Sequence, residues 1–290
     1  MGLPLVQESS IGGIRSTMRG SAVTFGPGKT EAPGSVFSPE LTIFSLEVRG
    51  GPFVRLDLRD VLIVVQRWRE ALVSQSNDMP AHIQEIVSGH GPRGAPLESP
   101  HLAFIPMASI GHPRADGRLL GLAAALPEGM TGADRHAVLR VLARVGELRL
   151  GRLGVWGLMP AIRLPWNLRP EAWTAYPVGA THWATVTPIA LDRHPKSKAP
   201  QAYRQEVAEV IAAGCVAVGL PRPREVIVTQ ASAHLGVPPA HAFPRLRRKD
   251  GTNRRHTHAI LVFDQPVRGP VLVGAGRYRG YGACRPLEAT

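Results

Sequence analysis

The hydrophobic positions of residues 39–163 alternate between the periods of strands and of helices. Apolar residues recur at helical spacing after residue 61 and again after Thr131, which stands three residues before Asp134 as in a weak capping box. Short β-like runs predict strands at residues 41–48, 101–105, 119–126 and 148–159. The resulting order β-α-β-β-α-β is that of a ferredoxin-like unit, an antiparallel sheet with both helices on one side.

The same order recurs, more loosely, in residues 181–290. A helix is expected to begin at Pro200, and its apolar face consists of Tyr203, Val207, Val210, Ile211 and Cys215. Strand-like runs occupy residues 182–191, 225–230, 258–263 and 271–273. A glycine-rich segment, residues 274–282, then leads to a terminal strand, so the second helix of this unit is very short.

These patterns predict an α+β protein built from two tandem ferredoxin-like (RRM-like) units with antiparallel sheets and a C-terminal glycine-rich loop. Residues 1–38 are rich in Gly, Ser and Pro and show no period, which predicts a flexible leader. The first unit then spans residues 39–163 and the second residues 181–290. Residues 164–180 contain three prolines and are expected to form the linker.

The charge of the chain predicts a polyanionic partner. Its 290 residues carry 34 Lys+Arg against 22 Asp+Glu, a net charge of +12, and only four of the basic residues are lysines. Arginine favours phosphate and carboxylate partners because its planar guanidinium binds them with two hydrogen bonds, although a GC-rich genome produces the same bias. Residues 240–286 hold ten basic residues and two acidic ones, which is the charge distribution of a nucleic-acid binder or of a solvated basic face.

Composition also excludes several classes of protein. With 44% apolar and 19% charged residues the chain can build a sizeable core, so neither disorder nor a collagen-like fold is expected. Cys215 and Cys284 match neither a zinc site nor a secreted disulfide framework. The apolar run at residues 119–126 is far shorter than the ~20 residues that span a bilayer. A cytoplasmic protein without a membrane partner is predicted.

The glycine-rich segment is the sharpest candidate site. Four glycines in nine residues allow close approach of a ligand, and Tyr278 and Tyr281 provide faces on which bases stack. A dinucleotide fingerprint would need glycine at position 279, and a purely structural turn is the alternative. The residues assigned here to RNA binding are Gly274, Gly276, Arg277, Arg279 and Gly280.

Histidines supply candidate catalytic groups. Single-stranded RNA is cleaved without a metal ion when a base removes the 2′-OH proton, that oxygen attacks the phosphate, and an acid protonates the leaving 5′-oxygen. Histidine exchanges protons in the useful pH range, and a surface or turn histidine is the alternative at each position. Four of the eleven histidines lie in loop-like, polar settings: His90, His112, His194 and His258.

Two further basic segments are candidate RNA contacts. Arg193 and Lys196 flank His194, and this trio either grips a phosphate or forms a solvated turn stabilised by Asp192. His256 and His258 share a strand face, but no carboxylate or cysteine lies at matching spacing nearby, so no metal site is predicted. Arg254, Arg255 and His258 are assigned to RNA binding, and no cofactor is expected.

Several sequence blocks together resemble a known family, the fused Cas-five/Cas-six subunit of subtype I-G (formerly I-U) CRISPR systems. The match resembles mainly the Cas-six-like part. The blocks are SGHGP (88–92), HLAFIP (101–106), GH (111–112) with ADGRLLG (115–121), TP (187–188) with LDRHPK (191–196), and PVRGP (266–270) before GAGRYRGYG (274–282).

The resemblance implies tandem ferredoxin-like folds of the RAMP superfamily and a glycine-rich loop that contacts CRISPR repeat RNA. It also implies metal-independent cleavage of precursor CRISPR RNA, after which the protein stays on the guide RNA with the other type I effector-complex subunits. The catalytic histidine of such enzymes typically lies in the first unit, which points to His90 or His112. Tyr278 is a possible second proton partner, and His194 remains a further catalytic candidate.

Members of this fused type usually carry a Cas-five-like portion first, which residues 1–38 are too few to supply. We therefore expect the function of a Cas-six protein from this chain, and we leave open whether it has Cas-five functions such as holding the 5′ handle of the guide RNA. A RAMP subunit that binds and caps guide RNA without cutting it is the alternative. A two-histidine phosphoesterase would need two H-x-T/S motifs on facing strands, and the segments at His182 and His256 do not fit that pattern.

Overall fold

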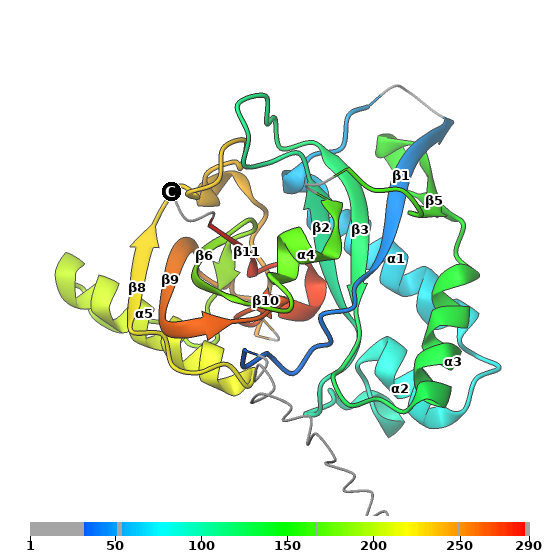
Figure 1. Ribbon diagram of the computed structural model, residues 1–290, viewed down its shortest axis with the longest axis horizontal. Coiled ribbons are helices and arrows are strands. Elements are labelled where there is room, and N and C mark those ends of the chain that lie inside the picture. The colour runs from blue at the N-terminus through cyan, green and yellow to red at the C-terminus, as the bar shows by residue number, and fades with distance from the viewer. Residues whose placement is uncertain (1–31, 51–53, 166–167, 249, 288–290) are drawn as a thin grey trace, which may run out of the picture. The chain divides into compact units, whose positions relative to one another are not determined.

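The computed structural model describes residues 32–50, 54–165, 168–248 and 250–287 (Figure 1). Its main strands form two antiparallel sheets, the first from residues before 161 and the second from residues after 179. Among the described helices, none combines the length and the apolarity needed to cross a membrane.

The first sheet has the ferredoxin-like arrangement. Its strands lie in the order β2-β3-β1-β5-β4, and without the edge strand β4 this is the order expected for a β-α-β-β-α-β unit. Trp68 of α1 packs edge-on against Phe44, 5.4 Å away, so the apolar face of the helix covers the sheet. The elements are β1 (Thr42–Gly50), α1 (Val61–Gln75), α2 (Ala81–Ser88), β2 (Ala103–Ala108), β3 (Leu119–Ala125), α3 (Gly132–Ala143), β4 (Glu147–Arg149) and β5 (Val155–Pro160).

The second sheet repeats the arrangement with one helix. Strands β11, β6, β9 and β8 are neighbours in that order, which again matches the unit, and a 3₁₀ turn at Arg277–Arg279 replaces the second helix. The predicted fold class is therefore confirmed by the topology. The elements are α4 (Pro170–Thr174), β6 (Ala180–Thr185), β7 (Ile189–Ala190), α5 (Pro200–Ala217), β8 (Glu225–Thr229), β9 (His256–Val267), β10 (Val271–Leu272) and β11 (Ala283–Pro286).

The structure differs from the sequence pattern where elements are short or interrupted. The strand expected at 148–159 divides into β4 and β5, because Gly151 and Gly154 adopt positive φ angles of 61° and 82° around a 3₁₀ turn. Helices α2 and α4 were not predicted, since eight and five residues are too few to show a helical period. The predicted cap of α3 is present, and the Asp134 N–H donates to Thr131 Oγ1 at 3.1 Å.

The predicted leader is partly wrong. Residues 1–31 lie outside the described residues, but residues 35–38 are packed into the molecule. Phe37 is 1% exposed, and the Ser35 hydroxyl donates to the Pro270 carbonyl at 2.8 Å. The predicted linker likewise contains α4, whose Trp173 is buried. In each segment one buried aromatic residue, Phe37 or Trp173, packs the chain against the protein. The Gly, Ser and Pro content of these segments indicates only that they lack a regular hydrophobic period.

Buried residues join the two halves. The larger hydrophobic core holds Trp68 and Phe104 of the first half together with Leu246 and Tyr281 of the second. Arg285 of β11 is also buried, and its guanidinium donates to the Ile110 carbonyl and the Ala172 carbonyl, both at 3.2 Å. Because these contacts join the first unit to the second, they hold the loops of the two units next to each other.

A close approach between the two halves predicts a stability effect. Gly280 has a φ of +78°, and a β-carbon there would lie 2.8 Å from Val61 Cγ2 of α1. Gly280→Ala should lower the free energy of unfolding by about 2–4 kcal/mol, from left-handed strain plus overpacking. Gly129→Ala is the control, because Gly129 has a similar φ of +75° with nothing within 4 Å, and it should cost only about 1 kcal/mol. Urea unfolding of both variants measures the difference, and equal losses would contradict the packing role.

Candidate functional site

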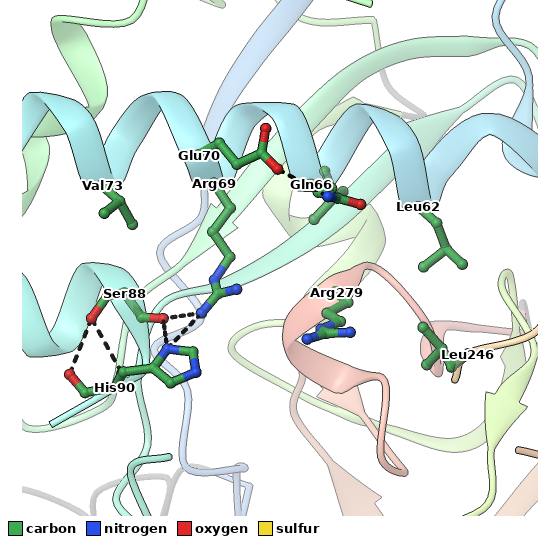
Figure 2. Close-up of a pocket in the computed structure, with 10 residues that line it drawn as sticks. Leu62, Gln66, Arg69, Glu70, Val73, Ser88, His90, Leu246 and Arg279 are labelled. Carbon is green, nitrogen blue, oxygen red and sulfur yellow. Dashed lines mark hydrogen bonds between the residues drawn. The ribbon is translucent and has the colours of Figure 1, made fainter. Parts of the chain in front are cut away.

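A pocket of about 530 Å³ lies between α1, the end of α2 and the glycine-rich loop (Figure 2). Its lining combines apolar side chains with two guanidinium groups and an imidazole. The lining residues are Leu62, Val65, Gln66, Arg69, Glu70, Val73, Ser88, His90, Leu246 and Arg279. The pocket therefore brings Arg69 and His90 of the first unit together with Arg279 of the glycine-rich loop.

His90 is held in the pocket by Arg69 and by the turn that ends α2. Gly89 adopts a φ of +68° as the C-cap, which turns the chain so that His90 follows the helix directly. Figure 2 shows Arg69 extending from α1 to His90, with Arg69 Nη2 lying 3.0 Å from His90 Nδ1. The same His90 nitrogen lies 2.9 Å from the Ser88 carbonyl oxygen, to which Arg69 also donates. His90 Nε2 has no hydrogen-bond partner among the described residues.

The two arginines of the pocket form no ion pair with any described carboxylate. Burial lowers the pKa of Arg69, and the positive charge of Arg279 lowers it further. Glu70 also lines the pocket, but its carboxylate accepts from Gln66 at 2.9 Å and from Arg67 at 2.8 Å. Two guanidinium groups facing one pocket without a paired carboxylate favour an anionic ligand such as a phosphate.

Behind this pocket, His101 and Tyr278 form a stacked pair. Their ring centroids are 3.5 Å apart with an interplanar angle of 19°, and Tyr278 also meets Phe37 edge-on at 5.8 Å. Burial lowers the pKa of His101 to about 4, and the nearby Arg69 and Arg277 charges act in the same direction. The pair is therefore a neutral packing element, and neither ring belongs to the residues that line the pocket.

The glycines of the loop are packed against the protein itself. A β-carbon at Gly274 would lie 2.5 Å from the Ala190 carbonyl oxygen, and one at Gly276 would lie 2.5 Å from Tyr281 Cβ. Gly280 is likewise buried, against α1. The close approach that the sequence assigned to an RNA backbone is thus made by protein atoms. Within the loop, Arg279 is the exposed side chain, and it lines the pocket.

The other candidate histidines lie away from this pocket. His112 is half-buried in the loop between β2 and β3, with its Nε2 at 3.3 Å from Ser109 Oγ, and His194 is exposed on a separate hollow. The prediction for His258 is wrong. Its side chain is fully buried, and its ring nitrogens lie 2.9 Å from Thr185 Oγ1 and 3.0 Å from the Pro238 carbonyl oxygen.

The remaining basic candidates divide into supporting and exposed residues. Arg254 donates to the Leu191 and Asp192 carbonyls, both at 3.0 Å, and Arg277 donates to the Gly274 carbonyl at 3.1 Å. These two arginines hold loops in place. Arg193, Lys196 and Arg255 are exposed. The described residues contain no group of three or more His, Cys, Asp or Glu side chains placed to hold a metal ion.

Two site residues were missed in the sequence. Arg69 follows Trp68 on an amphipathic helix, where an arginine normally faces solvent, and His101 stands at the start of an apolar run. The only signal in the sequence is Gly89, and it is indirect. A β-carbon at this position would lie 2.5 Å from Cδ2 of the His101 ring, so glycine allows the turn after α2 to pack against His101.

The sequence matches a family model. The model of the CRISPR-associated protein, GSU0054 family, covers residues 51–286, which is most of the chain. No curated protein matches the chain.

Three solved structures are similar, each at 11% sequence identity and each covering 86% of this chain and 99% of the other. One is described as "CRISPR associated protein Cas6", with a TM-score of 0.44. The second, "Characterization of a Cas6-related gene from Pyrococcus furiosus", has a TM-score of 0.42. The third, "An RAMP protein binding different RNA substrates", has a TM-score of 0.43. At these values the matches assign neither a reaction nor a ligand to this chain.

Buried histidines predict a loss of stability in acid. Burial lowers the pKa values of His101, His234 and His258 from 6.5 to about 4. The unfolded chain therefore takes up protons before the folded protein does, so this stabilisation is complete above pH 6.5 and is lost as the pH falls towards 4. Each histidine should remove about 1.4 kcal/mol of unfolding free energy per pH unit in that window.

Urea unfolding between pH 7.5 and pH 5 measures this slope. His101→Phe retains the ring that stacks on Tyr278 and should reduce the slope by one histidine's share. A free energy of unfolding that stays constant between pH 7 and pH 5 would contradict the prediction.

Proposed function

Since this chain belongs to the GSU0054 family of CRISPR-associated proteins, we propose that it binds CRISPR repeat RNA and cleaves precursor CRISPR RNA without a metal ion. The observation that carries the proposal is the pocket in which His90 lies with Arg69 and Arg279. It offers a proton-transfer group with one free ring nitrogen beside two unpaired guanidinium groups. These groups supply one proton transfer and the charge stabilisation at the phosphate for cleavage by an internal 2′-OH.

The reaction uses atoms of the RNA itself. The 2′-oxygen loses its proton and bonds to the adjacent phosphorus, the bond from phosphorus to the 5′-oxygen breaks, and that oxygen takes up a proton. The products are a 2′,3′-cyclic phosphate and a 5′-hydroxyl. His90 Nε2 accepts or donates one of these protons, while Arg69 and Arg279 stabilise the negative charge that develops on the phosphate oxygens. Arg69 also positions His90 through its contact with Nδ1.

We assign the catalytic role to His90 and not to His112. His112 contacts Ser109 and lies outside the pocket that holds the two arginines, and His194 lies on a different hollow. Tyr278 stacks on His101 and keeps Arg279 of the same turn beside α1, so we propose a positioning role for it.

The proposal for the CRISPR subtype and for the role of this chain follows the sequence resemblance. We propose that the protein belongs to a subtype I-G system and supplies the Cas-six-like function of the fused subunit. The cleaved RNA stays bound, and other type I effector-complex subunits assemble with it. A cytoplasmic location fits this role.

One observation favours the alternative, a subunit that binds and caps guide RNA without cutting it. Among the described residues that line the pocket, His90 is the single imidazole, so a second proton-transfer group would have to come from the RNA or from water. The same pocket would then hold a phosphate without breaking the chain.

Cleavage in EDTA separates these two functions. Wild-type protein incubated with end-labelled repeat RNA should leave a 2′,3′-cyclic phosphate, and a 2′-deoxy substitution at the scissile nucleotide should abolish the product because the attacking oxygen is missing. His90→Ala should slow single-turnover cleavage by about 10²–10⁴-fold. His136→Ala on the exposed face of α3 is the matched control and should cleave at the wild-type rate.

Retention of intact RNA by the wild-type protein would establish the binding-only function. If His112→Ala stops cleavage and His90→Ala does not, the site assignment fails while the reaction stands.

Removal of the loop arginine should affect both binding and chemistry. Arg279→Ala removes one phosphate contact, so the magnitude of the logarithmic salt dependence of repeat-RNA binding should fall by about 0.7–0.9. Single-turnover cleavage should also slow, because charge stabilisation at the phosphate is lost. Fluorescence anisotropy across a salt series and quenched cleavage assays measure the two effects. An unchanged salt dependence with normal cleavage would exclude Arg279 from the phosphate site.

A further inference from the structure

A second basic surface lies on the other unit. Residues 194–200, the first turn of α5 and Arg255 enclose a hollow of about 830 Å³, here called the basic hollow. Lys196, Lys198 and Arg255 give it three formal positive charges, and its lining contains no carboxylate. The chain has only four lysines, and two of them stand here two residues apart. The lining residues are His194, Pro195, Lys196, Ser197, Lys198, Pro200, Tyr203 and Arg255.

The backbone of this loop is held in place, whereas its charged side chains remain unpaired. The backbone N–H groups of Lys196 and Ser197 both donate to the Glu206 carboxylate, at distances of 2.9–3.0 Å. These bonds lower the pKa of Glu206, so its negative charge is directed at the loop backbone. Lys196 and Lys198 form no ion pair with any described residue. The backbone of such a loop needs no further ordering when its lysines contact a ligand.

An aromatic ring adjoins these charges. The guanidinium carbon of Arg255 lies 5.7 Å from the centroid of the Tyr203 ring, and Tyr203 itself is half-buried at the start of α5. Tyr203 and Pro200 also border a neighbouring slot of about 520 Å³, which is lined by apolar residues such as Leu191 and Val207 and by polar ones such as Arg204 and Gln230. A cationic hollow beside a slot of mixed character, with an aromatic ring between them, offers contacts for both the phosphates and the bases of a single nucleic-acid strand.

The basic hollow is connected to the first pocket through the glycine-rich loop. Arg277 Nη1 lies 4.0 Å from Asp192 Oδ1, at the start of the segment that forms the hollow. Arg277 and Arg279 belong to the same 3₁₀ turn, and Arg279 lines the first pocket. The segment that leads into the hollow therefore contacts the same turn that carries Arg279 to the first pocket.

We propose that the basic hollow is a second RNA site, which binds a single-stranded segment apart from the cleavage pocket. Lys196, Lys198 and Arg255 contact its phosphates, and a base lies against Tyr203. The proposal rests on the proposed function only in taking RNA as the ligand, and it needs neither cleavage nor recognition of the repeat.

The test measures binding of a fluorescein-labelled oligouridine of about 15 nucleotides, which carries no repeat sequence. Lys196→Ala/Lys198→Ala should weaken binding about tenfold and reduce the magnitude of the logarithmic salt dependence by about 1.4, since each contact on a single strand contributes about 0.7. The control, Arg149→Ala/Arg152→Ala, removes the same charge from exposed positions near β4 and should bind as the wild type does.

Stacking is tested separately. Tyr203→Leu should weaken oligouridine binding about tenfold, and Tyr203→Phe, which keeps the ring, should bind within about twofold of the wild type. Thermal unfolding of both variants shows whether α5 is still packed, because Tyr203 also packs against a smaller hydrophobic core of the second unit, which includes Val207 and Ile211.

The outcomes distinguish this proposal from the proposed function. Unchanged oligouridine binding by the double lysine variant overturns the second site, even if the wild type cleaves repeat RNA in EDTA. Weakened binding without any wild-type cleavage supports the second site and removes the enzymatic function. If polyglutamate binds as tightly as oligouridine and Tyr203→Leu has no effect, the hollow serves an acidic protein segment and the RNA proposal fails.

Discussion

The packing of the glycine-rich loop against α1 is the contact on which the candidate site depends. Gly280 has no side chain, so the loop lies directly on Val61 and Val65, and the stacking of Tyr278 on His101 holds the same turn from the other side. These contacts place Arg279 across the pocket from Arg69. Two guanidinium groups repel each other, and here apolar packing keeps them together until an anion neutralises them.

Three of the ten basic residues in residues 240–286 are used inside the protein. Arg285 donates to carbonyls of both halves, Arg254 donates to the backbone before residue 193, and Arg277 donates within the glycine-rich loop. Each of these arginines satisfies backbone oxygens that folding removes from water. Net charge therefore overstates the exposed positive surface of this segment, which includes Arg245, Arg247, Arg255 and Arg279.

The two basic sites differ in character because their charges are held differently. In the pocket, the Arg69 side chain itself is held by Ser88 and His90, which in the proposed function positions a phosphate for cleavage. In the basic hollow Glu206 holds the backbone, and Lys196 and Lys198 form no ion pair with any described residue. Lysines without a fixed partner suit the proposed role of holding a strand without a defined reacting atom.

Local patterns in the sequence determined the order of strands and helices, the cap at Thr131, the glycine-rich loop and the family resemblance, because periodicity, capping and turn chemistry act between near neighbours. The sequence also placed His90 and Arg279 among the candidates. Only the tertiary structure decided which candidates meet. It buried His258, filled the space at Gly274 and Gly276 with protein, and brought the unpredicted Arg69 and His101 to the loop. Contacts between residues far apart in the chain depend on how the two sheets pack against each other, and patterns between near neighbours in the sequence do not predict that packing.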